Sequence, residues 1–84
     1  MPKVKMYSTQ TCAFCKAERQ FLEDHKIDFE EVAVDKDPQA QQEMYVLSGG
    51  QLGVPFTVIT RDDGKLVGIL GFDQAQLKSE LGIT

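Results

Sequence analysis

The pattern of apolar and polar positions along the chain predicts four short strands, the first of which alternates apolar and polar residues. Each run is rich in β-branched, aromatic or long apolar side chains, as strands are. The four runs cover residues 4–7, 29–34, 56–60 and 66–70. The last two flank a turn sequence that contains Asp63-Gly64, a strong short hairpin signal. We therefore expect the third and fourth strands to form an antiparallel hairpin.

The segment 12–26 carries the pattern of an amphipathic helix. Its apolar side chains recur at helical spacing, which predicts one inward stripe with charged residues over the rest of the surface. The expected stripe is Phe14, Ala17, Phe21 and Leu22, and the expected outer residues are Lys16, Glu18, Arg19, Glu23 and Asp24.

Capping residues mark the starts of two further helices. Asp37 can accept hydrogen bonds from the first free N–H groups of a helix, and Pro38 suits the first helical position. Asp73 can cap a last helix in the same way. Phe72 and Leu77 then occupy the two positions of a hydrophobic staple, which would fix the angle at which the chain enters that helix.

The predicted order of elements is strand, helix, strand, helix, strand, strand, helix. The first three form a βαβ unit, which should be right-handed with parallel strands. Together with the hairpin they give an α/β fold, a four-stranded mixed sheet flanked by helices. We expect a single domain over residues 1–84, because 84 residues with 42% hydrophobic side chains suffice for one compact core.

Composition narrows the classes of partner. Thirteen acidic residues against nine basic ones give a net charge of −4, without a run of like charge. Nucleic-acid and anionic-membrane surfaces need clustered Lys and Arg, so neither partner is expected. No apolar stretch approaches the ~20 residues that cross a bilayer, and the N-terminus lacks the pattern of a signal peptide. We expect a cytoplasmic, reducing setting, in which two close cysteines indicate chemistry or metal binding.

Cys12 and Cys15 are the candidate reactive residues. Thiol–disulfide exchange needs a thiolate, and a helix N-terminus favours one through free N–H groups and roughly +0.5 of partial charge. The spacing places the second sulfur one turn further on the same face, where it can attack a mixed disulfide on the first. Thr11, just before the first cysteine, can cap this helix. Lys16 and Arg19 each have two interpretations: they add positive potential at this helix start, or they are simply solvated.

Metal binding and inert packing are the alternatives for this cysteine pair. Zinc needs four protein ligands, or three and a water, and His25 is the remaining strong ligand. It lies ~15–20 Å away at the far end of the same helix, at 1.5 Å per residue. We therefore expect no metal within one chain and interpret His25 as a surface residue at a helix C-terminus. A metal or cluster bridged between subunits stays open.

Two further segments stand out. In 53–56 (Gly-Val-Pro-Phe), Pro55 belongs at the first residue of a strand, because inside a central strand it would remove a ladder hydrogen bond. In 71–73 (Gly-Phe-Asp), Asp73 is a good helix cap without any ligand.

Taken together, the segments 7–16, 53–56 and 71–73 resemble a glutaredoxin of the thioredoxin-like superfamily, in the family's order and spacing. The resemblance covers nearly the whole chain and implies a thioredoxin-like fold. It implies a cis peptide at Val54-Pro55 beside the cysteines, with the Val54 backbone pairing with the cysteinyl segment of glutathione or of a protein substrate. It also implies that the Phe72 amide and the Asp73 carboxylate hold the γ-glutamyl end of glutathione.

Three positions depart from the family pattern. Ala13-Phe14 stands where Pro-Tyr is common, and Thr9 replaces a lysine that would help to hold a glutathione carboxylate. Phe72 stands where a second glycine is usual. A phenylalanine there is similar to the redoxins that serve ribonucleotide reductase and are recharged by thioredoxin reductase. Those redoxins normally carry a basic residue where Asp73 stands.

The sequence thus predicts a monomeric thiol–disulfide oxidoreductase without a bound cofactor, using a Cys12–Cys15 dithiol cycle. Its expected substrates are disulfide-containing or glutathionylated proteins. Its expected reductant is glutathione as co-substrate, or alternatively a flavin disulfide reductase such as thioredoxin reductase. Two rivals stay open: a glutaredoxin that bridges an iron–sulfur cluster between two subunits through Cys12 and glutathione, and a non-enzymatic adaptor that kept the fold.

Overall fold

The computed structural model describes residues 3–51 and 53–83, and its elements follow the predicted order. They are β1 (Lys3–Ser8), α1 (Ala13–Asp24), β2 (Phe29–Ala33), α2 (Pro38–Leu47), β3 (Phe56–Thr60), β4 (Leu66–Leu70) and α3 (Gln74–Leu81). The strands form one sheet in the order β2-β1-β3-β4. β1 pairs in parallel with β2 and antiparallel with β3, and β3 and β4 form the expected hairpin. The predicted mixed four-stranded α/β fold, of the thioredoxin-like type, is confirmed.

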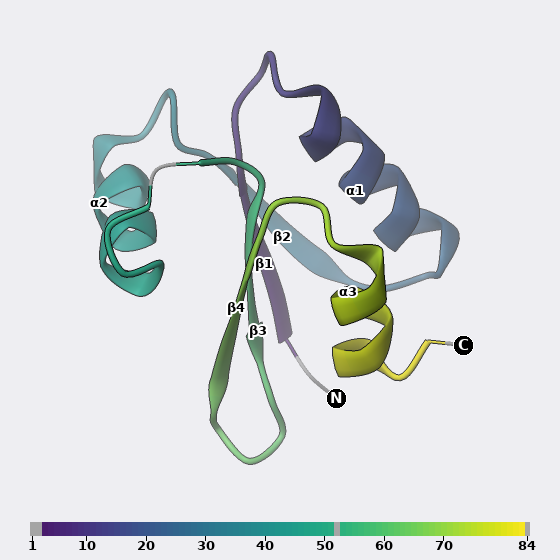
Figure 1. Ribbon diagram of the computed structural model, residues 1–84. Helices are drawn as coiled ribbons and strands as arrows, with labels where there is room; N and C mark the ends of the chain where they lie inside the picture. The colour runs from purple at the N-terminus through teal and green to yellow at the C-terminus, as the bar shows by residue number, and fades with distance from the viewer. Residues whose placement is uncertain (1–2, 52, 84) are drawn as a thin grey trace.

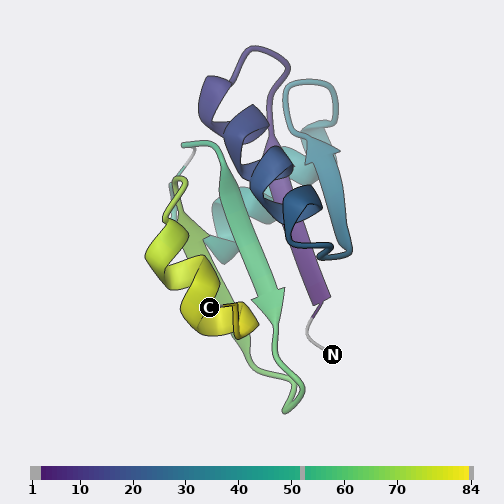
Figure 2. The ribbon, with the colours of Figure 1, turned by 90° about the vertical axis from the view of Figure 1, so that its right-hand side faces the viewer.

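The helices cover the two faces of the sheet in a three-layer arrangement. α2 lies against one face, and α1 and α3 lie against the other (Figure 1). A quarter turn places α1 and α3 together in front of the sheet with α2 behind it (Figure 2). This arrangement sandwiches the central strands β1 and β3 between helices, which is why their side chains are buried on both sides.

Alternate residues of the strands build two separate cores. The core under α2 consists of Tyr7, Val34, Ala40, Met44, Phe56 and Val58. The core under α1 and α3 consists of Val4, Leu22, Ile59, Ile69 and Leu77. Because successive strand side chains point to opposite faces, Val4 and Tyr7 of β1 serve different cores. Burial of both apolar faces holds the helices on the sheet.

The two predicted capping residues start their helices as expected. Asp37 accepts hydrogen bonds from the N–H groups of Gln39 and Ala40, with Pro38 at the first helical position. Asp73 accepts one from the N–H of Gln76 at 3.1 Å. These side chains satisfy backbone donors that the helix itself leaves free, so local sequence sets where α2 and α3 begin.

The predicted inward stripe of α1 is wrong in two positions. Phe14 is 68% exposed and Ala17 is also exposed, whereas Cys15, Glu18 and Leu22 are the buried residues. The positions 15, 18 and 22 are an equally good helical repeat. The expected stripe was chosen because Phe14 is apolar and Glu18 is polar. In the structure, α1 instead turns the face with Cys15, Glu18 and Leu22 toward the sheet. A glutamate therefore occupies a core position, and a phenylalanine next to the cysteines faces solvent.

No helix among the described residues 3–51 and 53–83 combines the length and the apolar character needed to cross a membrane.

Candidate active site

Three loops meet at one end of the sheet. The strand register pairs Tyr7 with Phe56 and Phe56 with Leu70, so the end of β1, the start of β3 and the end of β4 are neighbours. The loops that continue from these points carry the cysteines, the segment 53–55 and the segment 71–73 (Figure 1). The N–H of Gly71 donates a hydrogen bond of 2.8 Å to the carbonyl oxygen of Pro55, which joins the second loop to the third.

Cys12 itself is the N-terminal cap of α1. Its backbone is extended, and its Sγ accepts a hydrogen bond of 3.1 Å from the N–H of Cys15. The expectation that Thr11 caps this helix is wrong, because the helix begins one residue later than that role requires. A sulfur therefore occupies the place of a capping oxygen, where a backbone donor and the helix dipole both stabilise negative charge.

The two sulfurs differ in accessibility. Cys12 and Cys15 are joined in a disulfide with a Cα–Cα distance of 5.2 Å. Cys15 is completely buried, whereas Cys12 is only half-buried. An incoming thiol or disulfide can therefore approach Cys12, while Cys15 is reached only from within the molecule.

Val54-Pro55 is a cis peptide, as the resemblance implied. Pro55 is buried and comes directly before the first residue of β3, so it removes no hydrogen bond from the ladder. Val54 packs against the core under α2. The segment thus lies at the same end of the sheet as the cysteines, and Val54 comes two residues before the first paired residue of β3, Phe56.

Phe72 and Asp73 take the positions that the staple and cap patterns predicted. The Phe72 ring lies edge-on to the ring of Phe21 on α1, with 5.8 Å between centroids, and it packs against the core that contains Leu77. Asp73 is exposed. The Phe72 side chain is therefore committed to packing, while the Asp73 carboxylate lies at the surface as a helix cap.

Arg19 adds little uncompensated positive charge. Its guanidinium binds both carboxylate oxygens of Glu31 on β2, and Ser8 also donates to Glu31. The guanidinium holds the pKa of Glu31 below its ordinary value. Lys16 is exposed beside the cysteines, so of the two basic residues that the sequence singled out, Lys16 is the one placed to act on an approaching anion.

Sequence reasoning missed Glu18. This side chain is fully buried, and its Oε2 accepts a hydrogen bond from Thr57 Oγ1 on β3. Within the described part of the chain, its Oε1 has no hydrogen-bond partner. Burial raises the pKa of Glu18 to about 7, and the hydrogen bond from Thr57 opposes this shift. Its position three residues after Cys15 was the available signal, since residues at that spacing share a helix face.

His25 lies at the far end of α1, as expected. It follows the last helical residue, and its Nδ1 is 2.8 Å from the carbonyl oxygen of Phe21. The residues described here contain no cluster of three or more His, Cys, Asp or Glu side chains suited to a metal ion.

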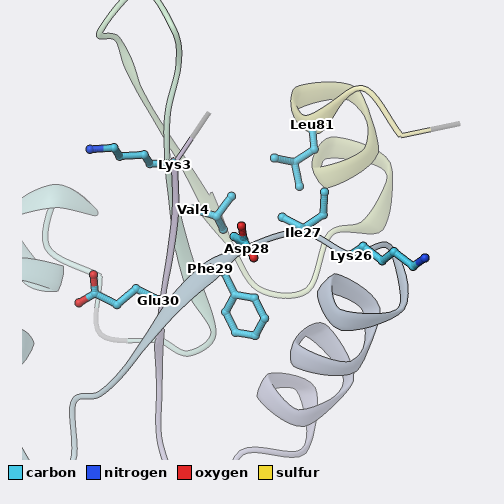
Figure 3. Close-up of a pocket in the computed structure, with 8 residues that line it drawn as sticks. All are labelled: Lys3, Val4, Lys26, Ile27, Asp28, Phe29, Glu30 and Leu81. Atoms are coloured by element: carbon cyan, nitrogen blue, oxygen red, sulfur yellow. The ribbon is translucent and has the colours of Figure 1, made fainter. Parts of the chain in front are cut away.

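A pocket of about 480 Å³ lies at the opposite end of the sheet from the cysteines (Figure 3). It is lined by Lys3, Val4, Lys26, Ile27, Asp28, Phe29, Glu30 and Leu81. These residues come from the starts of β1 and β2, from the loop between α1 and β2, and from the end of α3. The length of α1, about 18 Å at 1.5 Å per residue, separates this pocket from Cys12, so the pocket is not part of the cysteine site.

The sequence model of the glutaredoxin family matches residues 4–67, which include both cysteines and the cis-proline. The chain belongs to the glutaredoxin family. A "glutaredoxin-like 8.6 kDa protein in rubredoxin operon" of Clostridium pasteurianum is 40% identical over 74 residues, which cover 88% of this chain and 91% of that protein. The "glutaredoxin-like protein NrdH" of Lactococcus lactis is 32% identical over 74 residues, covering 88% of this chain and 97% of that protein.

The fold of this glutaredoxin matches solved structures of the family. The glutaredoxin of Archaeoglobus fulgidus superposes with a TM-score of 0.76 at 29% identity, over 96% of this chain and 87% of that one. Membership of the family, together with the Cys12–Cys15 disulfide, indicates thiol–disulfide oxidoreduction as the activity.

Proposed function

We propose that this chain reduces disulfides through a dithiol cycle in which Cys12 is the nucleophile and Cys15 is the resolving thiol. The observation that carries the proposal is the asymmetry of the pair. Cys12 is the accessible sulfur and receives the Cys15 N–H at a helix start, whereas Cys15 is buried behind it. A thiolate is favoured at the first position, and the second can act on whatever the first has bound.

The cycle has three steps. The Cys12 thiolate attacks one sulfur of a protein disulfide or of a glutathione mixed disulfide, and the other sulfur leaves as a thiolate. Cys15 loses its proton and attacks Cys12 Sγ, forming the Cys12–Cys15 disulfide and releasing the substrate sulfur as a thiolate, which solvent then protonates. An external reductant then supplies two electrons and two protons and restores both thiols.

The cis-proline segment supplies the docking edge in this proposal. Val54 lies just ahead of β3, beside the loop that bears Cys12. An extended peptide with a disulfide-bonded cysteine can pair with the Val54 backbone as an added strand. The Phe72 N–H and the Asp73 carboxylate then hold the γ-glutamyl group when the substrate is glutathionylated.

Glutathione is the first candidate for the reductant, and thioredoxin reductase is the second. Four observations favour thioredoxin reductase. Thr9 replaces a lysine that would bind a glutathione carboxylate. The positive charge of Arg19 is already paired with Glu31 and so is not free for that carboxylate. The chain is also similar to the relative named NrdH. In addition, a phenylalanine at position 72 is similar to the redoxins that are recharged by thioredoxin reductase.

The deciding experiment follows NADPH oxidation in two mixtures with the same disulfide substrate. One mixture contains glutathione and glutathione reductase, and the other contains thioredoxin reductase. The faster mixture identifies the reductant. Cys12→Ser serves as the control in both and should show no turnover. Normal turnover of Cys12→Ser in either mixture would overturn the proposed role of Cys12.

A further inference from the structure

Glu18 and Cys15 share one buried face of α1. Both are completely inaccessible to solvent, and residues three apart on a helix have Cβ atoms about 5–6 Å from each other. Helical side chains lean toward the N-terminus of their helix and cover the preceding turn. By this general rule we expect the Glu18 side chain to be directed toward the turn that holds Cys15, while its Oε2 is bound by Thr57 of β3.

The surroundings of the Glu18 carboxyl are apolar. A row of side chains crosses the sheet beneath α1, one from each strand, because directly paired residues point to the same face. The row consists of Glu31, Met6, Thr57 and Ile69. Met6 and Ile69, which flank Thr57, are buried apolar residues. Water is therefore excluded from both sides of the hydrogen bond that Thr57 donates to Glu18.

Among residues 3–51 and 53–83, the structure shows no ion pair to the Glu18 carboxyl. Glu31, the acidic member of the row, is bound by Arg19 of α1. From α3 the residue buried on this face is Leu77. Thr57 is the polar partner from β3, and it contacts one of the two carboxyl oxygens. The other oxygen is buried without a partner among the described residues, an arrangement that is rare in folded proteins and calls for an explanation.

We propose that Glu18 accepts the proton of Cys15 when this thiol resolves the mixed disulfide, and returns it when the disulfide is reduced. This inference rests on the dithiol cycle proposed above. In resolution, the proton moves from Cys15 Sγ to the Glu18 carboxylate. The sulfur electron pair forms the bond to Cys12 Sγ, and the substrate sulfur leaves with the electron pair of the old bond. In reduction, Cys15 leaves as a thiolate and takes a proton from the Glu18 carboxyl.

The burial of Cys15 means that its thiol needs a proton acceptor inside the protein. Cys15 is shielded from bulk water, so its thiol has no solvent base in contact with it, and burial disfavours its thiolate. With a pKa raised to about 7 by burial, Glu18 populates both its charged and its neutral form near neutral pH. A group with that property can accept and donate a proton in the same cycle.

The test separates the two sulfur steps with an aromatic disulfide, dithiobis(nitrobenzoate). Cys12 releases the first coloured thiolate, and Cys15 releases the second as it closes the disulfide. In stopped-flow measurements, Glu18→Gln should slow the second phase about tenfold or more at pH 7, since general bases of this kind contribute 10²–10⁴-fold. The first phase should stay within about twofold of the wild-type rate. Glu23→Gln, an exposed carboxylate on the same helix, is the matched control and should change neither phase.

A second variant guards against a purely structural effect. Thr57→Val keeps the carboxyl but removes the hydrogen bond that lowers the Glu18 pKa. The pH profile of the second phase should therefore shift to higher pH, while circular dichroism confirms an intact fold. A second phase with unchanged rate and pH profile in folded Glu18→Gln, or an unshifted profile in Thr57→Val, overturns the inference. The proposed function fails separately, through turnover of Cys12→Ser.

Discussion

The backbone N–H of Cys15 donates a hydrogen bond of 3.1 Å to Cys12 Sγ. The residue proposed to resolve the mixed disulfide therefore also stabilises the sulfur proposed as nucleophile, through its main chain rather than its side chain. Replacing the Cys15 side chain leaves this donor in place. The two functions of position 15 can thus be separated by substitution.

Cys15→Ser should accordingly keep part of one activity and lose the other. We expect measurable deglutathionylation, because glutathione itself can resolve the mixed disulfide on Cys12. Reduction of protein disulfides should fall to background, since the substrate stays covalently attached. Assays with a glutathionylated peptide and with a disulfide-bonded protein distinguish these outcomes. Equal losses on both substrates would contradict the assigned roles.

Cys12 in the reduced protein should ionise well below the pH at which a free cysteine does. Thiols at helix N-termini ionise at roughly pH 3.5–7.5, against about 8.5 for a free thiol. The rate of iodoacetamide alkylation of Cys15→Ser, measured against pH, reports this ionisation at Cys12 alone. A midpoint near that of free cysteine would show that the helix start does not stabilise the thiolate.

The buried carboxyl should make the folded state less stable as pH rises. Burial raises the pKa of Glu18 from its ordinary 4.5 to about 7, so the folded chain keeps a proton that the unfolded chain releases. The resulting stabilisation is complete below about pH 4.5 and is lost as pH rises through about 7. It amounts to something on the order of 3 kcal/mol. Urea unfolding of the oxidised protein should show this decline, and Glu18→Gln should remove it. Parallel curves for the two proteins would contradict the prediction.

Asp73→Asn separates the capping role of Asp73 from its proposed role in binding. Asparagine caps helices as well as aspartate does, so the free energy of unfolding should change little. Asp73→Ala should cost about 1 kcal/mol, because the Gln76 N–H loses its acceptor. If the carboxylate also holds the γ-glutamyl group, both variants should raise the KM for a glutathionylated substrate. An unchanged KM in both would leave Asp73 as a cap alone.

Gly68 on β4 is required by the ring of Phe56. A Cβ at this position would lie 2.9 Å from Phe56 Cζ, and the ring is held in the core under α2. Gly68→Ala should therefore destabilise the protein by about 1–3 kcal/mol. Gly53→Ala is the control, because its Cβ would meet Leu70 Cδ1 at an ordinary 3.8 Å, with an expected change within about 0.5 kcal/mol. Equal effects in urea unfolding would refute the steric argument.

The local features of this fold could be predicted from the sequence, whereas those that depend on packing between distant residues could not. The caps at Asp37 and Asp73 depend on side chains within a few residues, and they formed as expected. The rotation of α1 depends on β3, 39 residues further along the chain, where Thr57 receives Glu18. A charged side chain in an amphipathic pattern is assigned to the surface by default, and the face that Glu18 shares with Cys15 is identified as the buried one only when the helix is packed on the sheet.

The candidate site shows the same division. The spacing of Cys12 and Cys15 was sufficient to place both at the start of α1, because one helical turn joins them. The boundary itself was off by one residue, since Cys12 took the capping place expected for Thr11. The pairing of Arg19 with Glu31 joins α1 to β2 across the fold, and no short-range pattern marks it.

The hydrogen bond from Gly71 to the Pro55 carbonyl has a consequence for selectivity. Proline has no N–H, and the Gly71 N–H already occupies one acceptor position of the Pro55 carbonyl, so Val54 supplies the one N–H donor of this dipeptide and its other carbonyl. If a substrate docks there as proposed, contact at one residue fixes the position of its cysteine, and the sequence on either side contributes little to recognition. A docking point of this kind suits a reductant that acts on many different protein substrates.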